Sequence, residues 1–237
     1  MILIIAEPTD EPALWLRPRL AECVSGYVAI VTPTQLVCSR QIVHYLSDHA
    51  TSSQFVLVSG ETIESNALKG VVNRLGAAPA AQFAAASLRD RIYAQEELHA
   101  FLLGWLASLE CPVLNPPEPS FLAGPWYPPV EALQLAALAG LPFVSKHFTL
   151  DNIEVLVEEA GPLRTHFVLD GQVIGPIIQL QLREALLRFA ALWGGRLLQI
   201  DCGIVDGKPA FCRATSLVDF CLGGDLLVRA LARVLEP

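Results

Sequence analysis

Short apolar runs alternate with amphipathic stretches in the first part of the chain. The runs at 1–6, 27–31, 54–59 and 70–75 are rich in Ile, Val and Leu, which predicts buried β-strands. Between the first two runs, residues 10–24 carry a broad apolar face that is typical of a helix packed on a sheet. A strand, a helix and a second strand in this order predict an open α/β sheet.

The middle of the first half has a less regular pattern. Residues 34–48 fit two short antiparallel strands, QLVCS and IVHYLSD, or one helix, and we favour the strands. Residues 88–110 repeat apolar side chains near every 3.6 positions, which predicts a long helix. Trp105 belongs to the apolar face of that helix, so we expect it in the core, and we expect the same of Trp193.

Six prolines between residues 116 and 129 interrupt the pattern and predict an irregular linker. We therefore expect a first domain over 1–118 and a second over 119–237. In the second domain, two Asp-Gly pairs between apolar runs predict β-hairpins, because glycine tolerates the positive φ that tight turns need. The hairpins are expected at 164–176 and 197–216, and helices at 130–140, 178–193 and 223–235.

The apolar content is high, at 53% with a mean hydropathy of +0.45, which raises the question of a membrane protein. The longest apolar run, 132–144, is interrupted by Gln134, Gly140 and Pro142 and is too short to span a bilayer. The start MILIIAEPTDE has no basic region and turns polar after six residues, unlike a signal peptide. We therefore expect a cytoplasmic protein without a membrane span, whose apolar excess forms a well-buried core or a partner surface, such as that of a homodimer.

The net charge and the spacing of cysteines and histidines argue against two kinds of site. The net charge is −8 and no basic stripe is present, which argues against nucleic-acid binding. The six cysteines form no C-x-x-C pair and the five histidines lack ligand spacing, which argues against a metal site. We expect the cysteines to be reduced and mostly buried.

The hairpin at 197–216 carries the polar residues of greatest interest. Asp201 lies in the middle of its first strand, and Arg213 and Thr215 lie near the end of its second strand. These side chains could face one cleft and form a ligand site. Alternatively, Asp201 and Arg213 form a cross-strand ion pair, since opposite charges on adjacent strands attract each other. We favour the ion pair.

Two further groups of residues are candidates for binding a partner. Arg74 and Arg89 could grip a carboxylate of a peptide, or they could form salt bridges to acidic residues of the 88–110 helix, which we favour. The acidic residues in question are Asp90, Glu96 and Glu97. Trp126 and Tyr127 lie in the proline-rich linker, where an aromatic pair serves either recognition or core packing, and both interpretations stay open.

Four segments, in this order, resemble the ATP-grasp superfamily, nearest to the RimK-like and graspetide-type peptide ligases. They are GVVNRL, RIYAQEELHAFLLGWLASLECPVLNPP, AALAGLPFVSKHFT and RLLQIDCGIVDGKPAFCRATS. The resemblance covers most of the chain loosely. It implies an α/β (α+β) protein, in which an N-terminal pre-ATP-grasp-like open sheet is followed by a truncated ATP-grasp-like domain.

The chain departs from this family at the residues that carry its chemistry. In an active ATP-grasp enzyme, Glu-x-Asn on the last strand holds Mg²⁺ through hard oxygen ligands. The positions that match are Arg213 and Thr215, although Asp201 matches the other metal ligand. The central part offers one hairpin without the ATP-binding lysine, and Lys146 is the only lysine near it. Phosphoryl transfer depends on positioned cations and metal ions, so these departures predict a loss of catalysis.

The sequence therefore predicts a catalytically degenerate ATP-grasp-like protein that needs no cofactor. We expect it to bind a peptide or a partner protein, as an accessory subunit in a peptide-modification or biosynthetic pathway. The alternative is an active ATP-dependent carboxylate–amine ligase with unorthodox metal ligands, which requires ATP and Mg²⁺.

Overall fold

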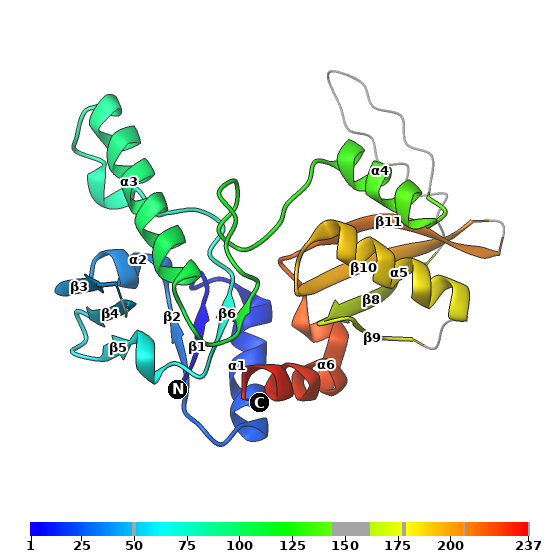
Figure 1. Ribbon diagram of the computed structural model, residues 1–237, viewed down its shortest axis with the longest axis horizontal. Helices are drawn as coiled ribbons and strands as arrows, with labels where there is room; N and C mark the ends of the chain where they lie inside the picture. The colour runs from blue at the N-terminus through cyan, green and yellow to red at the C-terminus, as the bar shows by residue number, and fades with distance from the viewer. Residues whose placement is uncertain (49–50, 144–161, 177–178, 206, 237) are drawn as a thin grey trace. The chain divides into compact units, whose positions relative to one another are not determined.

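The computed structural model describes residues 1–48, 51–143, 162–176, 179–205 and 207–236. The chain divides into two compact units (Figure 1). Unit 1 comprises Met1–Gly124 together with Val228–Pro237, and unit 2 comprises Pro125–Leu227. The last turns of the C-terminal helix thus belong to the unit that the N-terminus begins.

Unit 1 is built on a parallel sheet with the strand order β2-β1-β6-β7. β1 pairs in parallel with β2 on one side and β6 on the other, as the predicted open α/β sheet requires. Helix α1 begins where the Asp10 carboxylate accepts a hydrogen bond from the Ala13 amide (3.1 Å), which satisfies one free N–H of the first turn. The elements of the sheet and its helix are β1 (Ile2–Ile5), α1 (Glu11–Cys23), β2 (Val28–Val31), β6 (Gly70–Asn73) and β7 (Val113–Leu114).

A second, antiparallel sheet of unit 1 has the order β3-β4-β5. Its strands are β3 (Gln41–Leu46), β4 (Thr51–Val56) and β5 (Thr62–Glu64), so the predicted strand at IVHYLSD is confirmed. The predicted strand at QLVCS is wrong, because these residues lie in and just after helix α2 (Pro33–Val37). The Thr32 hydroxyl accepts from the Gln35 amide (3.1 Å) and the Gln35 side chain accepts from the Thr32 amide (2.9 Å), a capping box that starts the helix.

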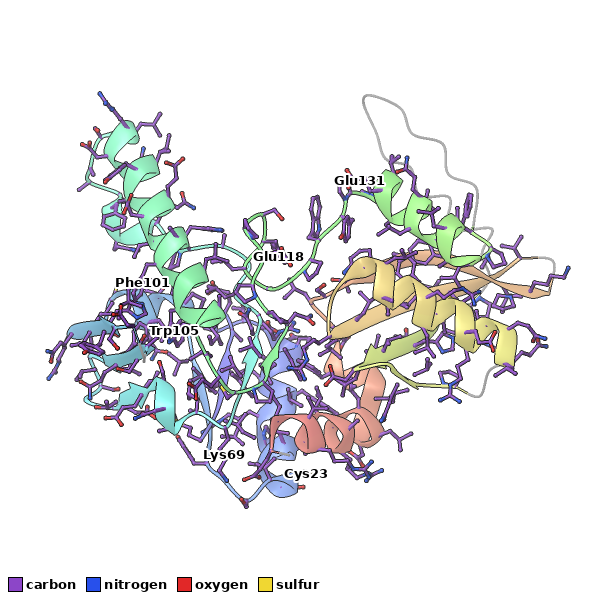
Figure 2. The ribbon with its side chains drawn as sticks, in the orientation of Figure 1. Cys23, Lys69, Phe101, Trp105, Glu118 and Glu131 are labelled. Atoms are coloured by element: carbon purple, nitrogen blue, oxygen red, sulfur yellow. The ribbon has the colours of Figure 1, made fainter. Side chains whose placement is uncertain are left out.

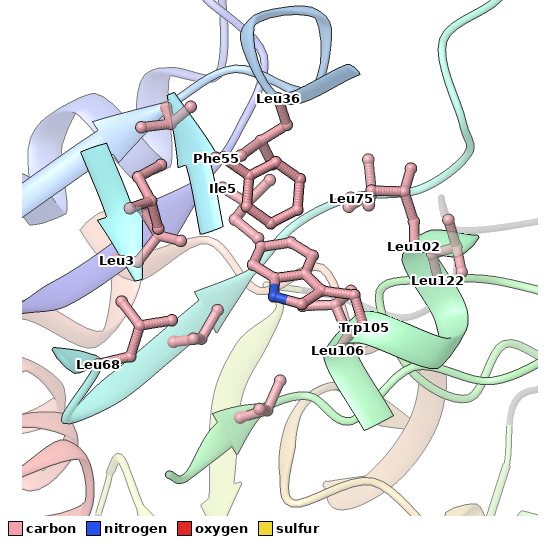
Figure 3. Packing of buried hydrophobic residues seen from close by; sticks show 14 of the residues in the cluster. Leu3, Ile5, Leu36, Phe55, Leu68, Leu75, Leu102, Trp105, Leu106 and Leu122 are labelled. Atoms are coloured by element: carbon pink, nitrogen blue, oxygen red, sulfur yellow. The ribbon is translucent and has the colours of Figure 1, made fainter. Parts of the chain in front are cut away.

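Helix α3 (Leu88–Ala107) closes the core of unit 1 and confirms the predicted long helix. Two short 3₁₀ helices, η1 (Ser65–Ala67) and η2 (Ala81–Phe83), precede it. Phe101 and Trp105 extend from α3 (Figure 2), and Trp105 lies against Phe55 of β4 with 4.7 Å between the ring centroids (Figure 3). Trp105 is fully buried and its indole N–H donates to the Ser65 hydroxyl (3.2 Å), so it is a core residue as predicted.

Leu235 and Glu236, at the end of α6, contact other residues of unit 1. Gly70 leaves the space that Leu235 fills, since a Cβ atom on Gly70 would lie 2.8 Å from the Leu235 carbonyl oxygen. The Glu236 carboxylate forms an ion pair with Lys69 and accepts hydrogen bonds from the amide (2.7 Å) and hydroxyl (2.5 Å) of Ser25. These hydrogen bonds lower the pKa of Glu236 to about 2, and the bond from Lys69 has the largest effect.

This pKa predicts how Glu236 contributes to stability as pH changes. A carboxylate with a lowered folded-state pKa stabilises the fold above its unfolded-state pKa, here 4.5, and loses that contribution as pH falls toward about 2. Glu236→Gln should therefore unfold at lower urea concentration than the wild type at neutral pH. The difference should shrink as the pH is lowered from about 4.5 to about 2. A difference that stays constant over this range would contradict the assignment.

Unit 2 is built on an antiparallel sheet with the order β11-β10-β8-β9. Helices α4 and α5 pack on one face, where their apolar side chains meet Leu198, Ile200 and Phe211 of the sheet. Trp193 at the end of α5 is buried and donates from its indole to the Pro125 carbonyl (3.2 Å), so it is also a core residue. The elements are α4 (Pro129–Ala139), β8 (Arg164–Leu169), β9 (Gln172–Ile174), α5 (Leu180–Trp193), β10 (Leu197–Val205), β11 (Lys208–Thr215) and α6 (Phe220–Leu235), which is kinked at Gly224.

The six cysteines divide between the core and the surface. Cys202 and Cys212 are buried, but Cys23, Cys38 and Cys221 are exposed, so the expectation of mostly buried cysteines is wrong. The exposed ones lie at or near the ends of helices, where their side chains point to solvent. No disulfide joins any of the six. Among the described helices, none is both long and apolar enough to span a bilayer.

Candidate functional site

The hairpin of β10 and β11 positions Asp201 opposite Arg213 and Gln199 opposite Thr215. Side chains two positions apart on a strand share a face, so Gln199 and Asp201 point away from the face that α4 and α5 cover. A register shift follows, because Cys202 pairs with Phe211 and leaves Cys212 as an extra residue in β11. Such a bulge keeps Arg213 beside Asp201 while Phe211 faces the core.

The Asp201 carboxylate is 3% exposed and is surrounded by donors. Arg213 Nε donates to Oδ2 (2.6 Å), and the Thr165 hydroxyl donates to Oδ1 (2.7 Å). The side-chain amide of Gln199 lies 3.2 Å from both oxygens. The ion pair predicted from the sequence is confirmed, and each carboxylate oxygen has two donors.

The other polar groups of the hairpin bond to nearby backbone. The Thr215 hydroxyl accepts from the Leu217 amide (3.1 Å), and the Gln199 side-chain oxygen accepts from the Asp219 amide (2.8 Å). Lys146, the one lysine expected near this cleft, lies outside the described residues. Within the described ranges, no three His, Cys, Asp or Glu side chains gather as metal ligands. Asp201 thus belongs to no such group among the described residues, and it is paired with a cation.

Arg74 lies at the end of β6 and is paired with Asp10, the residue that caps α1. Its guanidinium donates to both Asp10 oxygens, at 2.6 and 3.0 Å, and its side chain is 8% exposed. The predicted salt bridge from Arg74 to the acidic residues of the 88–110 helix is therefore wrong. The N-cap of α1 presents a carboxylate to Arg74, whereas Asp90 at the start of α3 accepts from the Ser87 hydroxyl (2.7 Å).

The remaining partner-binding candidates differ in exposure. Arg89 on the first turn of α3 is exposed and forms no ion pair with a described residue, so the salt bridge expected for it is wrong as well. Trp126 is 56% exposed. Tyr127 packs edge-on against Trp193 at 4.8 Å, and its hydroxyl donates to the Trp193 carbonyl (3.3 Å). The aromatic pair thus divides into an exposed Trp126 and a partly buried Tyr127.

Reasoning from sequence missed two residues that hold Asp201, namely Thr165 and Gln199. Gln199 could have been found, because the period of two along β10 puts it on the same face as Asp201. Thr165 could not, since it comes from the other hairpin and meets Asp201 only through the register of β8 and β10.

An apolar groove of about 420 Å³ lies between β8, β9 and the start of α6, all in unit 2. Leu163, Leu222 and Leu226 on its sides are 41%, 59% and 62% exposed. Phe167 and Ile174 also line it, and Arg164 lies among its lining residues. Exposed apolar side chains gathered in one groove are typical of a surface that binds another molecule.

Known proteins resemble the chain in structure, not in sequence. No protein-family model matches it, and no curated protein matches it by sequence. One similar structure is a Chryseobacterium gregarium RiPP-associated ATP-grasp ligase in complex with ADP and a leader and core peptide. The match covers 99% of this chain and 96% of the ligase chain, with a TM-score of 0.71 and 11% sequence identity.

Two further solved structures show the same likeness. The macrocyclase MdnC from Microcystis aeruginosa MRC, bound with precursor peptide MdnA, has a TM-score of 0.71 at 12% identity over 99% of this chain and 98% of its own. D-alanine–D-alanine ligase from Bacillus anthracis, complexed with ATP, has a TM-score of 0.52 at 9% identity. This match covers 99% of the present chain and 96% of the ligase chain. At such identities the likeness concerns the fold alone, and it confirms the fold class predicted from the sequence.

Proposed function

Because the chain has the ATP-grasp fold, we propose that it is a catalytically degenerate ATP-grasp-like protein that binds a peptide or a partner protein. It acts in the cytoplasm as an accessory subunit of a peptide-modification or biosynthetic pathway, as a monomer or a homodimer, without ATP or Mg²⁺. The observation that carries the proposal is the buried Asp201 carboxylate, which is paired with the Arg213 guanidinium.

The remodelled cleft of Asp201, Arg213 and Thr215 opposes metal binding by simple electrostatics. A guanidinium about 4 Å from a divalent cation repels it by up to about 8 kcal/mol at an effective dielectric constant near 20. Mg²⁺ also needs several oxygen ligands, and Asp201 must first give up Arg213 and Thr165 before it can serve as one. The cleft is therefore better suited to hold its own ion pair than to hold a metal–nucleotide complex.

The peptide partner is supported by the solved structures with this fold. Two of them hold a leader and core peptide or a precursor peptide, as their descriptions state. In unit 2 we assign the contact to the apolar groove between β8, β9 and α6 and to the exposed side chain of Trp126. Arg89, which is exposed in unit 1, is a separate candidate for binding a carboxylate of a partner. Tyr127 supports Trp126 by packing on Trp193, and Arg74 supports the β1–α1 junction through Asp10.

A display selection tests the peptide-binding proposal. A random peptide library is selected on the immobilised full-length chain, and enriched peptides are titrated by fluorescence polarisation. We expect peptides with apolar residues, and we expect Leu222→Asp to weaken their binding at least tenfold, or by about 1.4 kcal/mol, because the charge must be desolvated in the groove. Trp126→Ala should weaken binding in the same direction.

Leu138→Asp is the matched control. Leu138 is 74% exposed on α4 and does not line the groove, so the same substitution there should leave the affinity unchanged. Absence of any enrichment above the uncoated support, or an equal loss of affinity in Leu138→Asp, would contradict the assignment of the groove.

An active ATP-dependent carboxylate–amine ligase is the second candidate function. It is favoured by the retained Asp201 and by the ADP and ATP that two of the similar structures hold. Under this alternative Asp201 is a metal ligand, so Asp201→Asn should abolish an ATP-consuming activity of the protein. Turnover that is unchanged in Asp201→Asn dismisses the alternative.

A further inference from the structure

A separate cavity of about 350 Å³ lies in unit 2, on the face of the sheet that α5 covers. Its walls come from β8, from the beginning of α5, from the second half of β10 and from the start of β11. Cys202 lines this cavity, while its neighbour Asp201 points to the other face of the sheet and bonds to Arg213 there. The cavity is thus distinct from the remodelled cleft.

Part of the cavity lining is polar and has unused hydrogen-bonding capacity. Arg164 is exposed, and its guanidinium forms no ion pair with any described residue. His166 is 1% exposed, and its Nδ1 atom has no hydrogen-bond partner in the part of the chain that the structure describes. Gln179 adds a side-chain amide to the lining. Buried polar atoms are nearly always bonded, so the unpaired Nδ1 of this lining residue leaves capacity for one more hydrogen bond.

The charge of these polar lining residues selects an anion. Burial, followed by the nearby charge of Arg164, lowers the pKa of His166, which leaves the ring neutral at neutral pH. Among the described lining residues, the positive charge therefore comes from Arg164 alone. One guanidinium pairs well with one carboxylate, and a neutral imidazole can donate a further hydrogen bond to it. A phosphate dianion needs more positive charge than this.

The rest of the described lining is apolar and chemically inert. Leu182, Ile204 and Pro209 line it, and a volume of this size lies at the lower end of the range for small-molecule pockets. Burial raises the pKa of the Cys202 thiol to about 12, so the thiol stays protonated and is a poor nucleophile. The lining is therefore suited to binding and not to covalent chemistry.

We infer that this cavity binds a small amphipathic carboxylate. The carboxylate lies toward Arg164, His166 and Gln179, and the apolar body of the ligand lies against Leu182, Ile204 and Pro209. This site goes beyond the proposed peptide-binding function, because the cavity lies on the face of the sheet that α5 covers. Arg164 lines both the cavity and the apolar groove, whereas Leu182 lines only the cavity, so Leu182→Trp distinguishes the two.

Phenylacetate is a suitable probe, since it joins one carboxylate to a compact apolar ring. Its binding to the full-length protein is measured by saturation-transfer NMR and by calorimetry, with phenylacetamide as the uncharged analogue of the same shape. We expect saturable binding of phenylacetate with a dissociation constant of about 1 mM or lower, and at least tenfold weaker binding of phenylacetamide.

Two variants and one control complete the test. Arg164→Gln should weaken phenylacetate binding at least tenfold, and Leu182→Trp should abolish it by filling the cavity while the circular dichroism spectrum stays unchanged. Arg183→Gln is the control, because Arg183 is exposed on α5 and does not line the cavity. The inference is overturned if wild-type protein shows no saturable binding, or if Arg164→Gln binds phenylacetate as the wild type does. It is also overturned if Arg183→Gln loses as much affinity as Arg164→Gln.

Discussion

Arg213→Glu should lower the free energy of unfolding by about 2–4 kcal/mol in metal-free buffer. The substitution removes the charge-assisted hydrogen bond from Arg213 Nε to a carboxylate that is 3% exposed. It also puts a second carboxylate directly opposite the first on the neighbouring strand, where like charges repel. The Arg213 side chain is 69% exposed, so solvent screening keeps the loss below that of a fully buried pair. Urea denaturation measures the change.

The same variant should acquire a response to Mg²⁺. Two facing carboxylates form a hard-oxygen site, so millimolar Mg²⁺ should restore about 1 kcal/mol or more of the lost stability. Arg213→Gln is the matched control, because it removes the guanidinium without adding a carboxylate, and its stability should not depend on Mg²⁺. Equal stabilisation of the wild-type protein by Mg²⁺ would contradict the view that Arg213 closes the site.

Trp105→Ala should cost about 3–5 kcal/mol, the largest effect that we expect of any single truncation in unit 1. Trp105 is fully buried, packs on Phe55 at 4.7 Å and bonds to Ser65, so its removal leaves a cavity and an unpaired hydroxyl. The free energy of unfolding, again from urea denaturation, checks this. Trp126→Ala is the control, and because Trp126 is 56% exposed its change should stay within about 0.5 kcal/mol. A loss below about 1 kcal/mol for Trp105→Ala would contradict the assigned core.

The sequence predicted those parts of the fold that local patterns determine. The strand at Ile2–Ile5 is a continuous apolar run, the helix at Leu88–Ala107 has a helical apolar period, and the hairpin of β10 and β11 has an Asp-Gly turn. Helix α2 was missed because its cause is a cap, in which Thr32 and Gln35 exchange hydrogen bonds, and not a period. Five residues are also too few for a helical period to be seen.

The candidate site was predictable only where its partners are neighbours in a hairpin. Asp201 and Arg213 lie on the two strands of one hairpin, so the Asp-Gly turn brings them close. The register of that turn alone would place Cys212 opposite Asp201, and the bulge at Cys212 moves the pairing to Arg213. Asp10 lies 64 residues from Arg74 in the sequence. Their pairing depends on the parallel sheet, which brings the start of α1 close to the end of β6. No local pattern contains that information, which is why the partner of Arg74 was predicted incorrectly.

Calorimetric titration of the wild-type protein with Mg·ATP tests the central claim most directly. The double variant Arg213→Glu/Thr215→Asn, which recreates the Glu-x-Asn pattern, is titrated beside it to show what a restored metal site does. Because Asp201 is already paired with Arg213, the wild type should give no saturable heat up to millimolar nucleotide. Stoichiometric binding of Mg·ATP to the wild type with a micromolar dissociation constant would contradict the account and favour the active ligase.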